Sequence, residues 1–102
     1  MTGLSNLPAF PVPHPGELLR DEILPAAGLR PAQAAQRLGI SRQSLHAVLS
    51  ERAGISAEMA LRLAALFGNA PMHWINMQAQ YDLQRVRQRE GEHIAHIEPV
   101  AA

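Results

Sequence analysis

The sequence contains no cysteine, and aromatic residues make up only 4% of its 102 residues. Without cysteine the chain can form neither disulfide bonds nor a metal site with thiolate ligands. A reducing cytoplasm is compatible with this composition, and we expect a cytoplasmic protein. The hydrophobic residues, 47% of the chain, are mainly alanine and leucine, which favour helices over strands. A chain of this length is enough for one folded domain with a modest core.

Long hydrophobic runs are also absent, because no segment approaches the roughly 18 apolar residues of a membrane span. The first 16 residues lack the basic region, the continuous apolar stretch and the cleavage site of a signal peptide. The sequence has no glycine-rich phosphate loop, no HExxH and no GxSxG. His93 and His96 have helical spacing, but no further metal ligand accompanies them. We therefore expect no membrane association, no enzymatic activity, and no cofactor or metal.

The formal net charge is zero, which taken alone argues against a nucleic-acid-binding protein. The charges are unevenly distributed, however. Residues 30–62 hold five arginines against two acidic residues, a net charge of +3, whereas residues 1–29 carry −2 and residues 63–102 carry −1. Every basic residue is arginine, which binds phosphate and guanine in a bidentate manner, although genome composition can also account for arginine in place of lysine. The positive middle of the chain is where we expect a nucleic acid to bind.

Two short helices joined by a sharp turn are predicted at the centre of this basic segment. The first covers residues 31–38 and ends at Gly39, since glycine enters the left-handed conformation without steric cost. Ile40 fills the turn, and Ser41 stands where a helix N-cap belongs. The second helix covers residues 42–50. A helix, a short turn with glycine and a second helix form the plan of a helix-turn-helix.

Three further helices are predicted around this pair. The first runs from Pro15 or Gly16 to about Leu24, the fourth follows the N-cap Ser56 and ends at Gly68, and the fifth runs from Pro71 to about Arg89. Pro8, Pro11, Pro13 and Pro15 make residues 1–15 an extended arm. We therefore predict an all-α chain of five helices, with an extended N-terminal arm (1–15), a helix-turn-helix domain with a C-terminal helix (16–90) and a flexible tail (91–102).

Helical periodicity separates the core of this domain from its exposed face. Small and apolar residues are predicted to face inward from the helix pair: Ala34, Ala35, Leu38, Leu45, Val48 and Leu49. Trp74 and Tyr81 are predicted to belong to the core or to a dimer interface. The opposite face of the second helix fits the major groove of B-DNA, about 12 Å wide, and its N-terminal part meets the base edges. The residues predicted to face bases are Ser41, Arg42, Gln43, His46 and Ala47. Arg37, Ser50 and Arg52 are better placed for phosphates.

Four segments resemble the HigA-type antitoxins, which belong to the XRE group of lambda-repressor-like helix-turn-helix proteins. They are HPGELL (14–19), LGISRQSLHAVLS (38–50), GISAEMALRLAALFG (54–68) and PMHWINMQAQYDL (71–83). The resemblance implies an all-α domain that forms a homodimer, binds a palindromic operator in double-stranded DNA and represses its own operon. It also implies a cognate toxin, an mRNA-cleaving ribonuclease of the HigB/RelE type, and no catalytic activity of its own.

The sequence departs from the pattern of these relatives at two places. Relatives often begin the first helix of the pair with Ser-Gln, whose glutamine contacts DNA, where this chain has Arg30 and Pro31. That contact is either lost or supplied by Arg30, which we count among the phosphate-binding residues. Relatives often follow the second helix with Asn-Gly, where this chain has Ser50 and Glu51. Two alternatives to an antitoxin stay open, a solitary transcriptional regulator and a protein-interaction module that no longer binds DNA.

Overall fold

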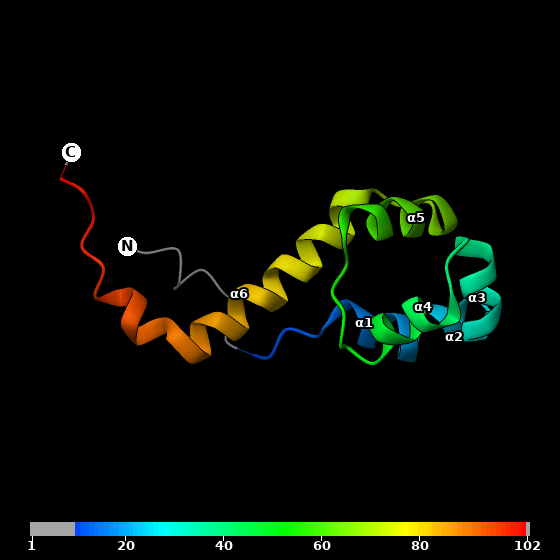
Figure 1. Ribbon diagram of the computed structural model, residues 1–102, viewed down its shortest axis with the longest axis horizontal. Coiled ribbons are helices and arrows are strands. Elements are labelled where there is room, and N and C mark those ends of the chain that lie inside the picture. Colours follow the sequence, from blue (N-terminus) through cyan, green and yellow to red (C-terminus); the bar gives the residue numbers. More distant parts are fainter. Residues whose placement is uncertain (1–9, 102) are drawn as a thin grey trace.

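A computed structural model describes residues 10–101, and within this range the chain forms helices and no strand (Figure 1). The elements in chain order are α1 (Pro15–Leu18), η2 (Leu19–Ile23), α2 (Leu24–Ala26), α3 (Pro31–Leu38), α4 (Arg42–Leu49), α5 (Ala57–Phe67) and α6 (Pro71–Ala95). Because α1, η2 and α2 follow one another without a break, they form one helical segment. The five predicted helices are confirmed. None of the helices among residues 10–101 combines the length and hydrophobicity needed to cross a bilayer.

The first helical segment contains a π-helical turn, η2, in its middle. The backbone N–H of Leu24 donates to the carbonyl oxygen of Leu19, five residues earlier. Both leucines are buried as a result, whereas Leu18 and Ile23 are only partly buried. The prediction that this helix ends at about Leu24 is wrong, because the segment continues to Ala26. Proline has no N–H to give to a helix, and Pro25 follows the wider π turn after one residue, Leu24.

His14 caps the N-terminus of this segment in place of the usual serine or aspartate. Its Nδ1 accepts a hydrogen bond from the backbone N–H of Gly16 at 2.8 Å, so this nitrogen carries no proton. His14 is 3% exposed, and its ring meets the Tyr81 ring edge to face, with centroids 4.8 Å apart. The cap therefore joins the first helical segment to α6.

Burial lowers the pKa of His14 below its ordinary value of 6.5, partly offset by the nearby carboxylates of Glu51, Asp82 and Glu17. The unfolded chain then binds a proton more readily than the folded chain, so stability is complete above about pH 6.5 and decreases as the pH falls through the folded pKa. We expect the melting temperature, followed by circular dichroism, to drop between pH 7 and pH 5. His14→Asn keeps a capping oxygen and should flatten this dependence. An unchanged slope in that variant would assign the pH dependence to another group.

The predicted helix boundaries around the central turn are confirmed. Gly39 adopts a left-handed φ of 73° at the end of α3, and Gly68 does so at the end of α5 with φ 76°. The Ser41 hydroxyl accepts from the Ser44 backbone N–H at 3.0 Å, and the Ser56 hydroxyl accepts from that of Met59 at 3.1 Å. These local bonds fix where α4 and α5 begin.

The core lies between the first helical segment, α3, α4, α5 and the beginning of α6. Its buried hydrophobic members are Leu19, Leu24, Ala34, Ala35, Leu38, Leu45, Val48, Leu49, Ile55, Met59, Ala60, Leu63, Ala64 and Trp74. All six residues predicted to face inward from the helix pair belong to it. Trp74 is 1% exposed, and its indole N–H donates to Asn69 Oδ1 at 2.9 Å. Trp74 is thus a core residue, and Tyr81 is partly buried against His14.

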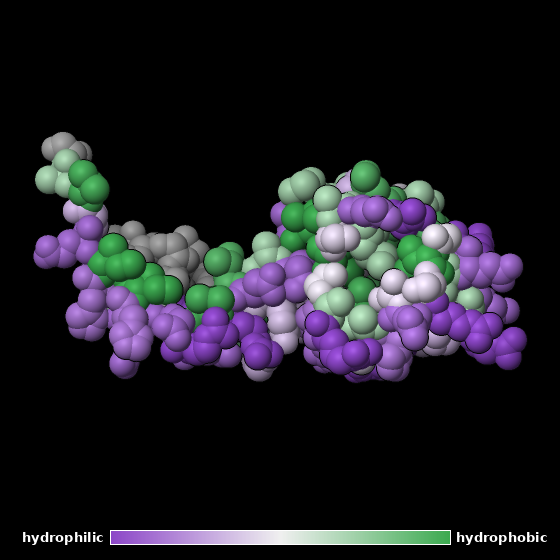
Figure 2. Space-filling view, viewed as in Figure 1, coloured by the Kyte–Doolittle hydropathy of each residue, from purple (hydrophilic) through white to green (hydrophobic). Residues whose placement is uncertain are grey.

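Helix α6 extends far beyond the helical body and gives the molecule its long axis of 52 Å (Figure 1). The predicted end near Arg89 is wrong, because α6 continues through Gly91 to Ala95. The projecting part carries hydrophobic side chains along one edge (Figure 2). The large exposed hydrophobic residues in the C-terminal part of the chain are Leu83 and Ile94 within α6, and Ile97 and Val100 after it.

The extended arm is described from Phe10 onward, and its earlier part lies outside the described residues. Here the arm runs beside α6 and is held by the side-chain amide of Gln84. The backbone N–H of Val12 donates to Gln84 Oε1 at 2.6 Å, and Gln84 Nε2 donates to the Phe10 carbonyl oxygen at 2.8 Å. The amide thus pairs with the backbone as a neighbouring strand would.

Candidate nucleic-acid interface

The first turns of α4 present three long polar side chains to solvent. Arg42, Gln43 and His46 are exposed, and none of them has a side-chain hydrogen bond or ion pair within residues 10–101. The opposite face of the helix buries Leu45 and Val48 in the core, which fixes the orientation of the exposed face. These side chains are therefore held outward on a rigid helix and have no partners among the described residues to give up before they contact a ligand.

A hollow on this side of the molecule brings most of the predicted residues together. Its lining residues are Arg20, Pro31, Ala32, Arg42, Gln43, His46, Ala47, Leu49, Ser50 and Arg52. Four of the five predicted base-facing residues and two of the four predicted phosphate-binding residues belong to this set. Ser41, Arg30 and Arg37 do not line the hollow.

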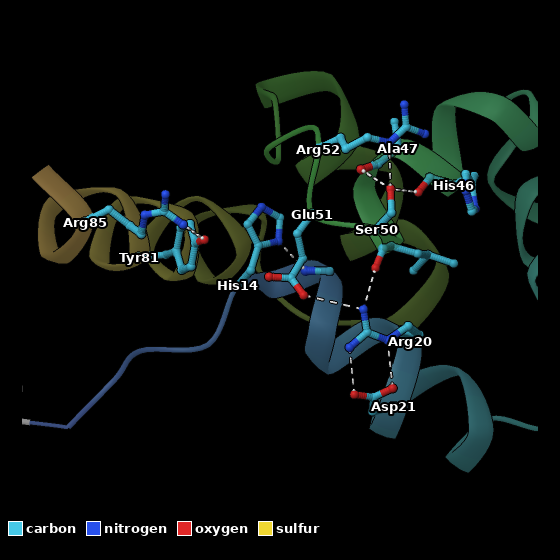
Figure 3. A network of polar contacts seen from close by, with 12 residues as sticks. His14, Arg20, Asp21, His46, Ala47, Ser50, Glu51, Arg52, Tyr81 and Arg85 are labelled. Carbon is cyan, nitrogen blue, oxygen red and sulfur yellow. Dashed lines mark hydrogen bonds and ion pairs between the residues drawn. The ribbon is translucent and has the colours of Figure 1, made fainter.

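The hydroxyl groups of Ser41 and Ser50 are both occupied by internal bonds. Ser41 caps α4 and also donates to the Ser44 hydroxyl at 2.9 Å. Ser50 donates to the His46 carbonyl oxygen at 2.8 Å and accepts from Arg52 Nε at 3.0 Å. Ser50 thus holds the Arg52 side chain beside the end of α4 (Figure 3). The roles predicted for the two serines at DNA remain predictions.

Arg30 and Arg37 stand at opposite ends of α3. The Arg30 backbone N–H donates to Gln33 Oε1 at 3.0 Å, which satisfies the helix start, and its side chain is exposed. Arg37 borders a separate hollow, shared with Leu38, Arg62, Ala65 and Leu66. Arg37 therefore does not line the hollow beside α4, and its phosphate contact remains a prediction.

Arg20 was not among the residues predicted from the sequence, yet it lines the hollow beside α4. Its guanidinium donates to both carboxylate oxygens of Asp21, at 2.8 and 3.0 Å, and to the carbonyl oxygen of Leu49 at 2.9 Å. The Asp21 hydrogen bond raises the pKa of Arg20 further, and Arg20 in turn holds the pKa of Asp21 below its ordinary value. The sequence signal for Arg20 is weak, because its other partners follow about thirty residues later, 29 for Leu49 and 31 for Glu51.

Comparison with known proteins identifies the family. A family model described as a helix-turn-helix domain matches residues 16–71. Antitoxin HigA-1 of Vibrio cholerae is 31% identical over 85 residues, which are 83% of this chain and 80% of that protein. The solved structure of the Pseudomonas aeruginosa antitoxin HigA with the higBA promoter has a TM-score of 0.82 and 37% identity, and the match covers 88% of this chain and 99% of that chain. The chain belongs to the HigA-type antitoxin family.

The chain is also similar to the virulence-associated protein I of Dichelobacter nodosus. It is 40% identical over 86 residues, which are 84% of this chain and 77% of that protein. The lengths covered show that the HigA-type similarity includes α6 as well as the helix-turn-helix. The expected lambda-repressor-like architecture and the resemblance noted in the sequence are thus both confirmed.

Glu51 is the departure from the HigA-type pattern with the clearest structural effect. It has a left-handed φ of 65°, a conformation that costs a non-glycine residue roughly 1–2 kcal/mol. Its carboxylate lies 3.5 Å from Arg20 Nη1 (Figure 3). Glu51 thus brings a negative charge to the end of α4, and Arg20 partly offsets it.

Proposed function

We propose that this chain is an antitoxin that binds a palindromic operator as a homodimer, represses its own operon and neutralises a cognate mRNA-cleaving toxin of the HigB/RelE type. Family membership supports the proposal, since the similar Pseudomonas aeruginosa protein is an antitoxin solved with promoter DNA. The proposed role needs no catalytic residue, because both activities are binding events.

The exposed face of α4 is the observation that carries the DNA-binding part. Its side chains match base edges in the major groove: arginine pairs with guanine, glutamine with adenine, and the alanine methyl group with thymine. Arg42, Gln43 and Ala47 supply these three chemistries on one helix face. Arg52, held by Ser50, supplies a cation beside the same face for the phosphate backbone.

DNA binding is tested with the purified chain and the DNA that precedes its own gene. A dimer making about 6–10 phosphate contacts should lose roughly 10³–10⁵ in affinity between about 50 and 200 mM salt. Footprinting should show two half-sites about 10–10.5 base pairs apart, or a multiple of that spacing. Unrelated DNA of the same length is the control. If neither DNA binds at the lowest salt, the chain is a protein-interaction module and the DNA-binding part of the proposal is wrong.

Toxin neutralisation is tested with the small basic ribonuclease that we expect to be encoded next to this chain. Mixing the two proteins should inhibit RNA cleavage at equimolar ratio and yield a stable complex in size-exclusion chromatography. The hydrophobic edge of the projecting part of α6, with Leu83 and Ile94 exposed, supports a protein partner, because such patches mark interaction sites. Operator binding without any neighbouring ribonuclease would instead identify a solitary transcriptional regulator.

A further inference from the structure

Arg20 belongs to the first helical segment but lies at the end of α4. Its Nη1 donates to the carbonyl oxygen of Leu49, the last residue of α4, at 2.9 Å. Carbonyl groups at a helix C-terminus lack partners within the helix and carry partial negative charge. Arg20 satisfies one of them and places a positive charge, in addition to that of Arg52, beside the carbonyl end of α4 and the Glu51 carboxylate.

The other edge of the same guanidinium faces Asp21 (Figure 3). Nε donates to Asp21 Oδ1 at 2.8 Å and Nη2 donates to Oδ2 at 3.0 Å. Two parallel bonds of this kind are also how arginine grips a phosphate group. The Asp21 carboxylate therefore occupies the edge that a DNA phosphate would use.

The ion pair between Arg20 and Asp21 can open so that a phosphate replaces the carboxylate. The side chain of Arg20 is 43% exposed and that of Asp21 is 54% exposed, and exposed ion pairs contribute little to stability. Arg20 also borders the hollow that contains Arg42, His46 and Arg52. A DNA backbone lying along α4 would thus pass an arginine whose bidentate edge is held only by a solvent-exposed neighbour.

We propose that Arg20 is a phosphate-binding residue of the operator interface and that Asp21 is its internal competitor. This inference rests on the proposed DNA-binding function. The Leu49 bond keeps the guanidinium in position while Asp21 is exchanged for a phosphate. The affinity for DNA is then set in part by a carboxylate that never contacts DNA.

The test compares salt titrations of the wild-type chain and three single variants on the upstream DNA and on unrelated DNA. Arg20→Gln should weaken both DNAs by the same factor, about tenfold, and reduce the slope of log affinity against log salt by about 1. Asp21→Asn should strengthen binding to both DNAs by about threefold to tenfold, because the bidentate edge becomes free. Glu22→Gln removes the same charge from the next residue, which is exposed. It should raise the affinity for DNA by less than Asp21→Asn does.

The double variant Arg20→Gln/Asp21→Asn separates competition from simple charge removal. The gain of Asp21→Asn should disappear in it. Equal gains for Asp21→Asn and Glu22→Gln, or a gain that persists in the double variant, would overturn the inference.

A lower melting temperature with an unchanged salt slope in Arg20→Gln would make Arg20 a structural residue only. If Arg20→Gln does not fold, the comparison of Asp21→Asn with Glu22→Gln still shows whether Asp21 competes with DNA for Arg20. Absence of DNA binding by the wild-type chain would instead refute the proposed function itself.

Discussion

Replacing Gly16 with alanine is expected to lower the free energy of unfolding by about 3 kcal/mol, near the upper end of overpacking effects. A Cβ atom at this position would lie 1.9 Å from the backbone carbonyl oxygen of Val48. Because that oxygen belongs to α4, neither a side-chain rotation nor a local shift can relieve the contact. The first helical segment and α4 would have to separate. Urea denaturation followed by circular dichroism measures the loss.

Gly91 offers a matched control, because it is also a glycine inside a helix. Its nearest neighbour to a new Cβ would be the Arg87 Cγ atom at 3.6 Å, an ordinary contact. Gly91→Ala should therefore stabilise the chain by about 0.5–1 kcal/mol through the higher helix propensity of alanine. The same substitution thus has opposite signs at two positions. Equal effects at both would show that backbone propensity, and not the approach of two helices, governs Gly16.

Replacing Arg42 with alanine is expected to weaken operator binding by roughly 1–3 kcal/mol, the usual value of one bidentate base contact. Arg42 is exposed in the first turn of α4 and has no side-chain partner within residues 10–101. Its loss should therefore leave the fold unchanged. Specificity should relax at one base pair of each half-site, which a set of single-substitution operators would reveal in binding assays.

Two comparisons make this result interpretable. Arg89→Ala removes the same charge from α6, where Arg89 forms a 3.7 Å ion pair with Glu90, and should leave operator affinity nearly unchanged. Unrelated DNA should lose little affinity in Arg42→Ala. If both DNAs weaken equally, Arg42 contacts a phosphate and not a base. If neither weakens, the face of α4 is not the DNA-binding surface.

Local chemistry explains why the ends of α3, α4 and α5 could be predicted from the sequence. Gly39 and Gly68 supply the left-handed residue that ends a helix, and Ser41 and Ser56 bond to an N–H only three residues away. These interactions involve immediate neighbours, so the sequence order contains them. The core face of α4 follows in the same way from helical periodicity.

The features that the sequence did not predict depend either on partners distant in sequence or on departures from regular helix rules, such as a glycine or a π turn inside a helix. Arg20 binds the Leu49 carbonyl 29 residues later, and no local pattern specifies such a pair. The flexible tail was predicted to begin at residue 91, but Gly91 lacks the left-handed φ found at the glycines that end α3 and α5, and α6 continues through it. The π turn that moves Leu24 into the core likewise has no signature in hydrophobic spacing, which assumes a regular 3.6-residue period.

The hydrogen bonds between Gln84 and the N-terminal arm have a consequence for the order of folding. The hydrogen bond between the Val12 N–H and Gln84 joins residues 72 positions apart, whereas the caps of α4 and α5 close within three. Contacts between distant residues form late, because loop closure must first restrict the chain between them. We therefore expect the arm to dock after the helical body has formed and to open while that body stays folded, since the described part of its backbone is held by side-chain hydrogen bonds to Gln84 and not by helical ones.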